Sequence, residues 1–238
     1  MRMAGKITAD ALRLASEIAQ EDITTDYLNT EIERYIVSKG GIPVFKGYRG
    51  FPKSICTSIN EEVVHGIPGS RRLKNGDILS VDVGVSYRKY VADAAVTIPI
   101  GKITNDAQRL VDVCENSLQR AISVIKSGEK LSRISKTIQD YVEMNDYTVV
   151  RNYTGHGIGR CMHEDPQVPN FVSKALLEAD EILVQGMTIA IEPMICMGKY
   201  DTEVLNNKWT VVTKDRKLSA HFEHTVVVTD DGADILTV

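Results

Sequence analysis

The sequence predicts a fold of mixed helices and strands that is built from two similar halves. Two observations predict it. A pair of amphipathic helical patterns precedes a strand-like stretch twice along the chain, and the two units superpose without a gap. The shift is 106 residues, which places Leu12 on Leu118. We therefore expect one domain over residues 1–238, with halves of about 1–105 and 106–238.

Helical periodicity predicts four helices, over residues 7–20, about 25–39, 104 or 105 to about 126, and 132 to about 145. Either Thr104 or Asn105 is expected to cap the third helix, because a short polar side chain can accept a free backbone N–H there. Strands and loops are expected to dominate from residue 147 onward, apart from a short helical turn near 173–179.

A long β-hairpin is expected over residues 78–98, where two β-branched runs alternate. With Tyr87 and Arg88 at the turn, Asp82 lies opposite Asp93. Opposed carboxylates repel, and burying them without a counter-charge costs several kcal/mol or forces protonation. A divalent cation would remove the conflict. The other interpretations are a register slipped by one residue, or two aspartates at a solvated rim.

The repeat supplies a second pair of acids. With small changes of offset, Asp82 falls on Glu192 and Asp93 on Glu223. Chance can explain matches between apolar helix positions, but it explains less well why both acids fall on acids. If the halves pack about a pseudo-twofold axis, four carboxylates converge there, and two divalent ions would neutralise them.

The histidines supply candidates for further roles. His156 lies in Thr-Gly-His-Gly-Ile-Gly and has no counterpart in the first half, so it is either an added imidazole ligand or a loop histidine that caps a turn. Four carboxylates and one imidazole suit Mn, Fe, Co or catalytic Zn. His65 and His163 are near repeat partners, expected as hydrogen-bond donors or proton carriers, or simply as loop histidines. His221 and His224 flank Glu223, and both are expected to point away from it.

Composition excludes several classes of protein. The net charge of −4 gives no basic field for nucleic acid. Four widely spaced cysteines indicate neither a zinc ribbon nor a disulfide framework and are typical of reduced, cytosolic thiols. The N-terminus shows no signal peptide, and the most apolar window, 184–198, is too short for a bilayer. A cytoplasmic location without nucleic-acid or membrane contact is expected.

Seven motifs carry a family resemblance that covers almost the whole chain. They are Gly-Tyr-Arg-Gly-Phe-Pro-Lys-Ser-Ile-Cys-Thr-Ser-Ile-Asn-Glu-Glu-Val-Val-His-Gly-Ile-Pro, Val-Asp-Val-Gly, Ala-Asp-Ala-Ala-Val-Thr, Gly-His-Gly-Ile-Gly, Met-His-Glu-Asp-Pro-Gln-Val, Ile-Glu-Pro-Met and Ser-Ala-His-Phe-Glu-His-Thr. With them the sequence resembles the type I methionine aminopeptidases. The resemblance implies the α+β pita-bread fold, in which two pseudo-symmetric halves curve an antiparallel sheet around a dinuclear metal site.

The resemblance also implies an activity and its participants. The activity is hydrolytic removal of the initiator methionine from nascent proteins, with small second residues preferred, by a water that two divalent metal ions (Co, Mn, Fe or Zn) activate. The partners would be N-terminal Met peptides and, transiently, the ribosome. A monomer is expected.

Roles carry over by position. Asp82 would bind one metal, His156 and Glu192 the other, and Asp93 and Glu223 both. The catalytic group would comprise His65, His163 and Glu192, with both histidines contacting substrate and Glu192 moving a proton. The methionine side chain would contact Tyr48, Phe51, Cys56, Met162 and Trp209, although an aromatic residue is common in the family at the positions of Phe51 and Met162.

Three alternatives remain at this point. Prolidases and proline-specific aminopeptidases share a similar ligand set but usually carry an added N-terminal domain. A non-catalytic relative would have lost metal ligands, all of which are present here. A cysteine hydrolase built from Cys161 and His163 lacks any visible activating context.

Overall fold

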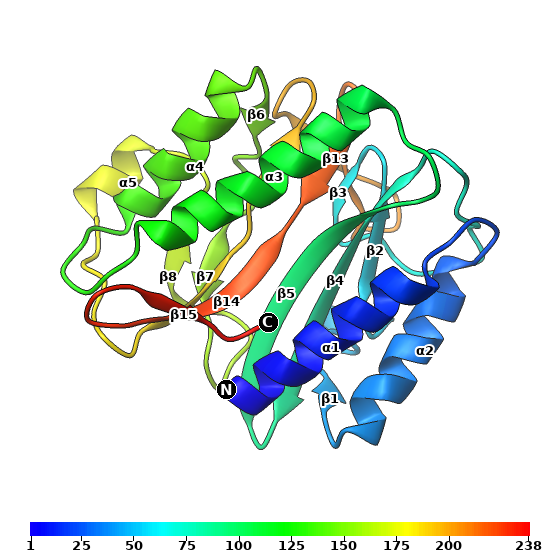
Figure 1. Ribbon diagram of the computed structural model, residues 1–238, viewed down its shortest axis with the longest axis horizontal. Coiled ribbons are helices and arrows are strands. Elements are labelled where there is room, and N and C mark those ends of the chain that lie inside the picture. The colour runs from blue at the N-terminus through cyan, green and yellow to red at the C-terminus, as the bar shows by residue number, and fades with distance from the viewer.

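The computed structural model describes residues 1–238, in which helices cover one face of a curved sheet (Figure 1). The helices are α1 (Arg2–Ile18), α2 (Thr25–Ser38), α3 (Asn105–Ser123), α4 (Ser132–Met144) and the short α5 (Lys174–Glu178). All four predicted helices are present, and α5 lies where a helical turn was expected. The first begins five residues early because Ala4 and Gly5 extend its buried stripe toward the N-terminus. Thr104 caps α3, since its side chain accepts the N–H of Ala107.

The strands are short except for two. They are β1 (Ile42–Pro43), β2 (Cys56–Ile59), β3 (Glu62–Val64), β4 (Ile78–Tyr87), β5 (Tyr90–Pro99), β6 (Thr148–Val149), β7 (Gly155–Gly157), β8 (Glu164–Val168), β9 (Thr188–Ile191), β10 (Met194–Cys196), β11 (Thr202–Val204), β12 (Val211–Thr213), β13 (Ser219–His221), β14 (Glu223–Val228) and β15 (Ala233–Ile235). The main sheet has nine strands in the order β1-β4-β5-β14-β9-β7-β8, with β2 beside β4 and β15 beside β14. All its pairings are antiparallel.

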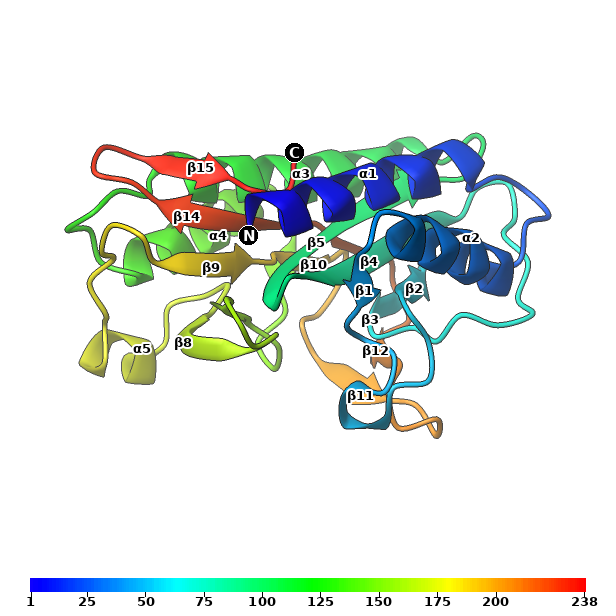
Figure 2. The ribbon, with the colours of Figure 1, turned by 90° about the horizontal axis from the view of Figure 1, so that it is seen from below.

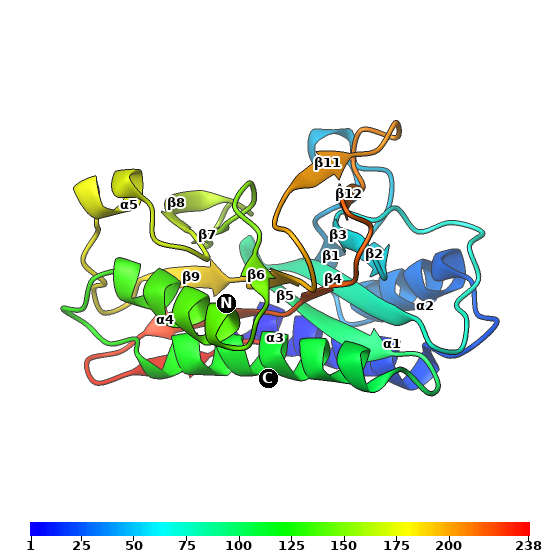
Figure 3. The same cartoon turned by 90° about the horizontal axis from the view of Figure 1, so that it is seen from above.

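The two faces of this sheet differ. Helices α1 and α3 run along one face, whereas α5 on one side and β11 and β12 on the other lie beyond the opposite face, toward which the β7–β8 edge of the sheet curls (Figures 2 and 3). One hydrophobic core of 17 buried residues joins α1 and α2 to β4 and β5, and another of 25 joins α3 and α4 to β9 and β14. Leu12 and Leu118, which the repeat pairs, lie in the first and the second core.

The β4–β5 hairpin has a different register from the predicted one. Its turn is Arg88-Lys89, both with positive φ (50° and 68°), so Asp82 lies opposite Ala95 and Gly84 opposite Asp93. The predicted pairing of the two aspartates is therefore wrong by two residues. Because two residues are one full pleat, both side chains still share a face, as diagonal rather than direct neighbours. No glycine or asparagine marks this turn, which is why the sequence placed it one residue early.

Strands β5 and β14 join the two halves of the sheet. Between them Glu223 lies opposite Ala95 and His224 opposite Ala94. At one end the Thr225 hydroxyl accepts the N–H of Asp93 and donates to its carbonyl oxygen, at 2.9 and 2.7 Å. At the other end Thr97 does the same for His221, at 2.9 and 2.8 Å. These threonines fix the backbone beside the acids. None of the helices is both long and apolar enough to cross a bilayer.

Candidate active site

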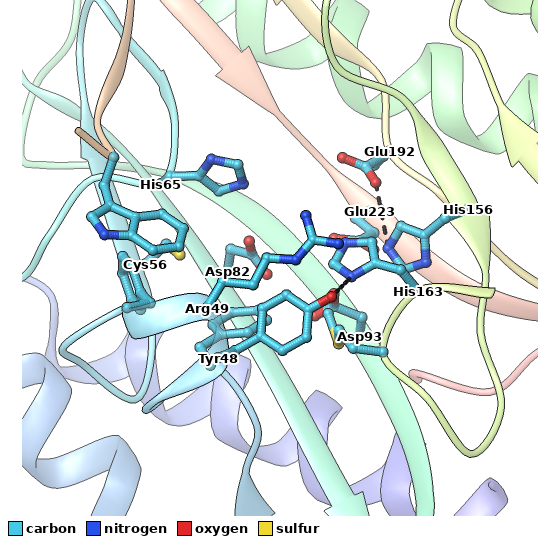
Figure 4. Close-up of a pocket in the computed structure, with 14 residues that line it drawn as sticks. Tyr48, Arg49, Cys56, His65, Asp82, Asp93, His156, His163, Glu192 and Glu223 are labelled. Carbon is cyan, nitrogen blue, oxygen red and sulfur yellow. Dashed lines mark hydrogen bonds and ion pairs between the residues drawn. The ribbon is translucent and has the colours of Figure 1, made fainter. Parts of the chain in front are cut away.

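A single cavity of about 160 Å³ brings together every residue predicted to bind metal or substrate (Figure 4). It is lined by Phe45, Tyr48, Arg49, Phe51, Cys56, His65, Asp82, Asp93, His156, Met162, His163, Glu192, Trp209 and Glu223. Strand alternation explains why the cavity lies on the face of the sheet away from the helices. Val81 and Val83 face the helices in the first core, so Asp82 between them faces the other side of the sheet. The two residues that the sequence did not predict are Phe45 and Arg49.

Four acids from four places in the fold converge in this cavity. Asp82 comes from β4, Asp93 from β5, Glu192 from the end of β9, and Glu223 from the start of β14. Asp93 and Glu223 are 3% and 2% exposed. Single oxygens of three of these carboxylates, Asp82 Oδ1, Asp93 Oδ1 and Glu223 Oε1, are buried without any hydrogen-bond partner. Burying a carboxylate oxygen without a partner costs free energy, and a bound cation would remove that cost.

The electrostatics of the acids reflect the same conflict. Burial raises the pKa of Asp82 to about 7. Burial and the charges of Glu223 and Asp82 hold the pKa of Asp93 well above its ordinary value. The pKa values of Glu192 and Glu223 are also well raised, first by burial and then by neighbouring carboxylates. Without a counter-charge the protein would have to bind protons here near neutral pH.

His156 presents a free nitrogen lone pair to the acids. Its Nδ1 lies 2.8 Å from the carbonyl oxygen of Gly157, which can only accept, so Nδ1 carries the proton. Its Nε2 then faces Glu192 Oε1 at 3.7 Å, two acceptors that repel unless a cation lies between them. Burial lowers the pKa of His156 to about 4, which keeps it neutral. Ligand atoms of Asp93, His156 and Glu223 lie within 4.8 Å of one another. This donor set fits a divalent metal.

His65 and His163 border the same cavity from two loops. The Tyr48 hydroxyl and Nδ1 of His163 share a hydrogen bond of 2.7 Å. Burial and the positive charge of Arg49 lower the pKa of His163. His65 has a positive φ of 59°, an uncommon backbone conformation that often occurs at functional sites. Burial, with His163 adding a smaller effect, lowers its pKa to about 4.

Aromatic residues form the apolar wall of the cavity. Phe51 packs edge-on against Trp209 at 5.1 Å and against Phe45 at 6.5 Å between ring centroids. The small cluster that contains them also includes Cys56 and Met162. Cys56 lies directly opposite Asp82 in the β2–β4 ladder, which explains how a buried strand residue reaches the pocket.

The cysteines do not provide a nucleophile. Burial and the nearby carboxylates hold the pKa of Cys56 well above its ordinary value, so it stays a thiol. Cys161 is exposed and does not line the cavity. Its proposed partner, His163, has its Nδ1 engaged by Tyr48 instead. The geometry therefore gives no support to a cysteine hydrolase.

His221 lies in the site, contrary to the expectation that it points away. Its Nε2 is 4.0 Å from Glu192 Oε2 and 4.0 Å from Glu223 Oε2. Residues two apart on a strand share a face, so alternation should have placed it beside Glu223. His224, one residue from Glu223, does point away, and its Nδ1 pairs with the Thr237 hydroxyl at 2.9 Å. Phe45 and Arg49 come from an irregular segment. Arg49 lies within the Gly-Tyr-Arg-Gly-Phe-Pro motif, next to the predicted contact Tyr48, whereas Phe45 lies outside the quoted motifs.

Comparisons with known proteins agree along the whole length of the chain. Residues 1–230 match metallopeptidase family M24. Methionine aminopeptidase 1 of Bacillus subtilis is 47% identical over 237 residues, which are 100% of this chain and 94% of that protein. Methionine aminopeptidase of Clostridium perfringens is 46% identical over 238 residues, with the same coverage.

Solved structures give the same result for the fold. Methionine aminopeptidase from Rickettsia prowazekii superposes with a TM-score of 0.96 at 42% identity, covering 100% of this chain and 95% of that one. Prolidase from Pyrococcus furiosus shares the fold alone, with a TM-score of 0.78 at 21% identity, and this chain covers 62% of it. The predicted α+β pita-bread fold is confirmed, and the chain belongs to metallopeptidase family M24.

Proposed function

We propose that this protein is a metal-dependent aminopeptidase that removes the N-terminal methionine from nascent proteins. One observation carries the proposal: the free nitrogen lone pair of His156 and three buried, unpartnered carboxylate oxygens face the same cavity that aromatic residues enclose. A charged centre that needs a cation thus lies beside an apolar, aromatic wall. Full-length similarity to methionine aminopeptidases supports the same assignment.

Divalent metal is held by five residues in this proposal. Asp82 would hold one ion and His156 and Glu192 the other, and Asp93 and Glu223 would serve both. When bound, such ions lower the pKa of a coordinated water toward neutrality and so supply a nucleophile. Two ions fit four carboxylates by charge, and Co, Mn, Fe and Zn all fit the mixed oxygen and imidazole donors.

The protein's own residues then bind the substrate and move the proton. The α-amine of the substrate binds on the Asp82 side, which restricts cleavage to chain ends. Glu192 takes a proton from water at a carboxylate oxygen and delivers it to the leaving amine. His163, with Nδ1 accepting from Tyr48, carries its proton on Nε2 and donates it as a hydrogen bond to the developing oxyanion. His65 contacts the amide of the second residue.

The pocket suits a methionine side chain. Aromatic and apolar side chains line one part of the cavity, beside the acids. Methionine is flexible, and its sulfur makes favourable contacts with aromatic rings. Phe51, Trp209 and Met162 would provide the wall, with Tyr48 and Cys56 completing it. The narrow site favours small second residues.

Several features of the setting stay predictions. They are a single domain of two halves, a monomer, transient contact with the ribosome, and a cytoplasmic location. Sedimentation of the metal-loaded protein tests the monomer, and co-sedimentation with ribosomes that carry nascent chains tests the contact.

The direct test is peptide hydrolysis after removal and return of metal. Chelator-treated protein should be inactive on Met-Ala-Ser and regain activity with Mn²⁺ or Co²⁺, whereas Met-Leu-Ser should be cleaved far more slowly. Asp93→Asn should abolish metal-dependent release of methionine without unfolding the protein, and Asp231→Asn, an exposed acid, should change nothing. Full activity of Asp93→Asn in chelator would refute the metal mechanism.

A second substrate distinguishes methionine removal from the proline-specific activity of related enzymes. Ala-Pro peptides are the substrates expected of a prolidase-like or proline-specific enzyme. Faster hydrolysis of Ala-Pro than of Met-Ala would assign this chain to that activity instead.

A further inference from the structure

His221 is a buried polar residue that the proposed mechanism does not use. It is 2% exposed, and its Nε2 has no hydrogen-bond partner. A buried polar atom without a partner is uncommon and costs about 1–3 kcal/mol, so its position needs an explanation.

The backbone of His221 is held firmly in place. Thr97 accepts its N–H and donates to its carbonyl oxygen, and strand β13 pairs it with Met194. These contacts fix the backbone position from which the imidazole extends. In that place Nε2 has Glu192 Oε2 and Glu223 Oε2 as its two acidic neighbours, each at 4.0 Å.

The chemistry of these neighbours fixes the direction of any hydrogen bond. Ionised carboxylates only accept, so the tautomer with the proton on Nε2 is the favoured one. A normal N–H···O distance is about 2.9 Å, which leaves a gap of about 1 Å. Hydrogen bonds in active sites are often long in the free enzyme and tighten when the site is filled.

We infer that His221 is a positioning residue for the metal centre, donating from Nε2 to the carboxylates of Glu192 and Glu223. The inference rests on the proposed function, in which both glutamates hold metal and Glu192 also moves the proton. Carboxylates that bind metal are themselves usually held by hydrogen bonds, and loss of such a partner typically costs about 10–100-fold in metal affinity or activity.

A matched pair of variants isolates the donor. His221→Gln keeps an N–H donor on an unbranched side chain, and His221→Met has a similar length and shape without any donor. Mn²⁺ binding to chelator-treated protein, measured by calorimetry, is the primary readout. We expect His221→Gln to stay within about threefold of the wild type and His221→Met to bind Mn²⁺ about 10–100-fold more weakly.

Kinetics supply a second readout that a purely structural role would not change. With Mn²⁺ saturating, His221→Met should lower kcat on Met-Ala-Ser while KM stays nearly constant, because Glu192 loses its orientation for proton transfer. His221→Gln should restore kcat. His224→Gln and His224→Met, on the next strand, β14, with a side chain that pairs with Thr237 away from the acids, should leave Mn²⁺ binding unchanged.

Each other outcome overturns the inference. Unchanged Mn²⁺ binding and kcat in both His221 variants would show that the imidazole has no role at the centre. Equal losses in both would show that the imidazole itself binds the cation rather than donating a hydrogen bond. If His221→Met does not fold in chelator, as judged by circular dichroism, His221→Leu replaces it. Mn²⁺ binding is measured without peptide, so a failure of methionine specificity would refute the proposed function and leave this test intact.

Discussion

At the scale of single residues, the site is defined by polar atoms that have no partner within the protein. The five proposed metal ligands were predicted from the sequence, because acids stand out in apolar strands and His156 stands out between glycines, and all five line one cavity. Their neighbours could not. Arg49 and Phe45 reach the cavity only through the path of an irregular segment, and side-chain chemistry alone does not encode that path.

His156 should control metal affinity more strongly than any other histidine. Replacing it by alanine removes the Nε2 lone pair that faces Glu192 and the Nδ1 bond to Gly157. We expect Mn²⁺ affinity to fall by at least about 100-fold, the upper end of the effect of removing an outer partner. Calorimetric titration of chelator-treated protein measures this. His224→Ala is the matched control, and comparable losses in both variants would contradict the assignment.

Arg49 should tune the pH dependence through His163. Burial is the main cause of the lowered pKa of His163, and the Arg49 charge is the second, since a nearby cation disfavours imidazolium. Arg49→Gln should therefore raise this pKa by a part of the shift, and the acidic limb of kcat/KM should move to higher pH. A pH series on Met-Ala-Ser measures the limb. Arg120→Gln, on α3, should leave the profile in place, and a move to lower pH in Arg49→Gln would refute the argument.

At the scale of elements, helical periodicity and N-cap residues predicted the four helices, whereas the predicted register of the β4–β5 hairpin was wrong. Helix α3 begins at its threonine cap as expected, because that signal is local. The β4–β5 turn depends on two ordinary residues in a left-handed conformation, which no local signal announces. The shared face of Asp82 and Asp93 survived the error only because it amounted to two residues.

The same turn should be open to stabilisation. Lys89 is exposed and has φ of 68°, a conformation that costs a residue with a side chain about 1–2 kcal/mol. Lys89→Gly relieves this strain but adds freedom to the unfolded chain, so a net gain of about 0.5–1 kcal/mol is expected. Thermal unfolding should show a rise in Tm of a few °C. Lys39→Gly, where φ is −89°, should lower Tm instead. A fall in Tm for Lys89→Gly would contradict the claim that the positive φ of Lys89 strains the turn.

At the scale of the whole molecule, the internal repeat carried the fold prediction. Repeat-paired helices pack on opposite halves of one sheet, and repeat-paired acids meet where β5 and β14 join. Such long-range symmetry is visible in sequence because both halves preserve apolar spacing. Met162, just before β8, and Trp209, between β11 and β12, also line the pocket, and the family resemblance rather than the repeat assigned them to it.

The convergence of acids makes the stability of the metal-free protein depend on pH in a definite direction. A carboxyl group whose pKa is raised by folding holds its proton more tightly in the folded state. The free energy of unfolding therefore decreases as pH rises from the unfolded pKa through the folded one. For Asp82 this window runs from 3.8 to about 7, and for Asp93, Glu192 and Glu223 it extends upward from an ordinary acidic pKa.

The buried histidines act in the opposite direction but in a lower window. The pKa values of His65, His156 and His224 are lowered from 6.5 to about 4, and that of His221 to about 3, in each case mainly by burial. Their contribution to stability rises with pH below 6.5 and is constant above it. Between pH 6.5 and 8.5 only the carboxyl groups remain, so the Tm of chelator-treated protein should fall.

Each proton that the folded state holds and the unfolded state does not lowers the free energy of unfolding by about 1.4 kcal/mol per pH unit. For a chain of this length, one such proton lowers Tm by several °C over two pH units. Mn²⁺ should abolish the fall, because the cation takes the place of the protons and binds more tightly as pH rises. Asp93→Asn, with one carboxyl fewer, should show a shallower slope in chelator. A metal-free Tm that is constant or rises between pH 6.5 and 8.5 would contradict the raised pKa values of the four carboxyl groups in the folded protein.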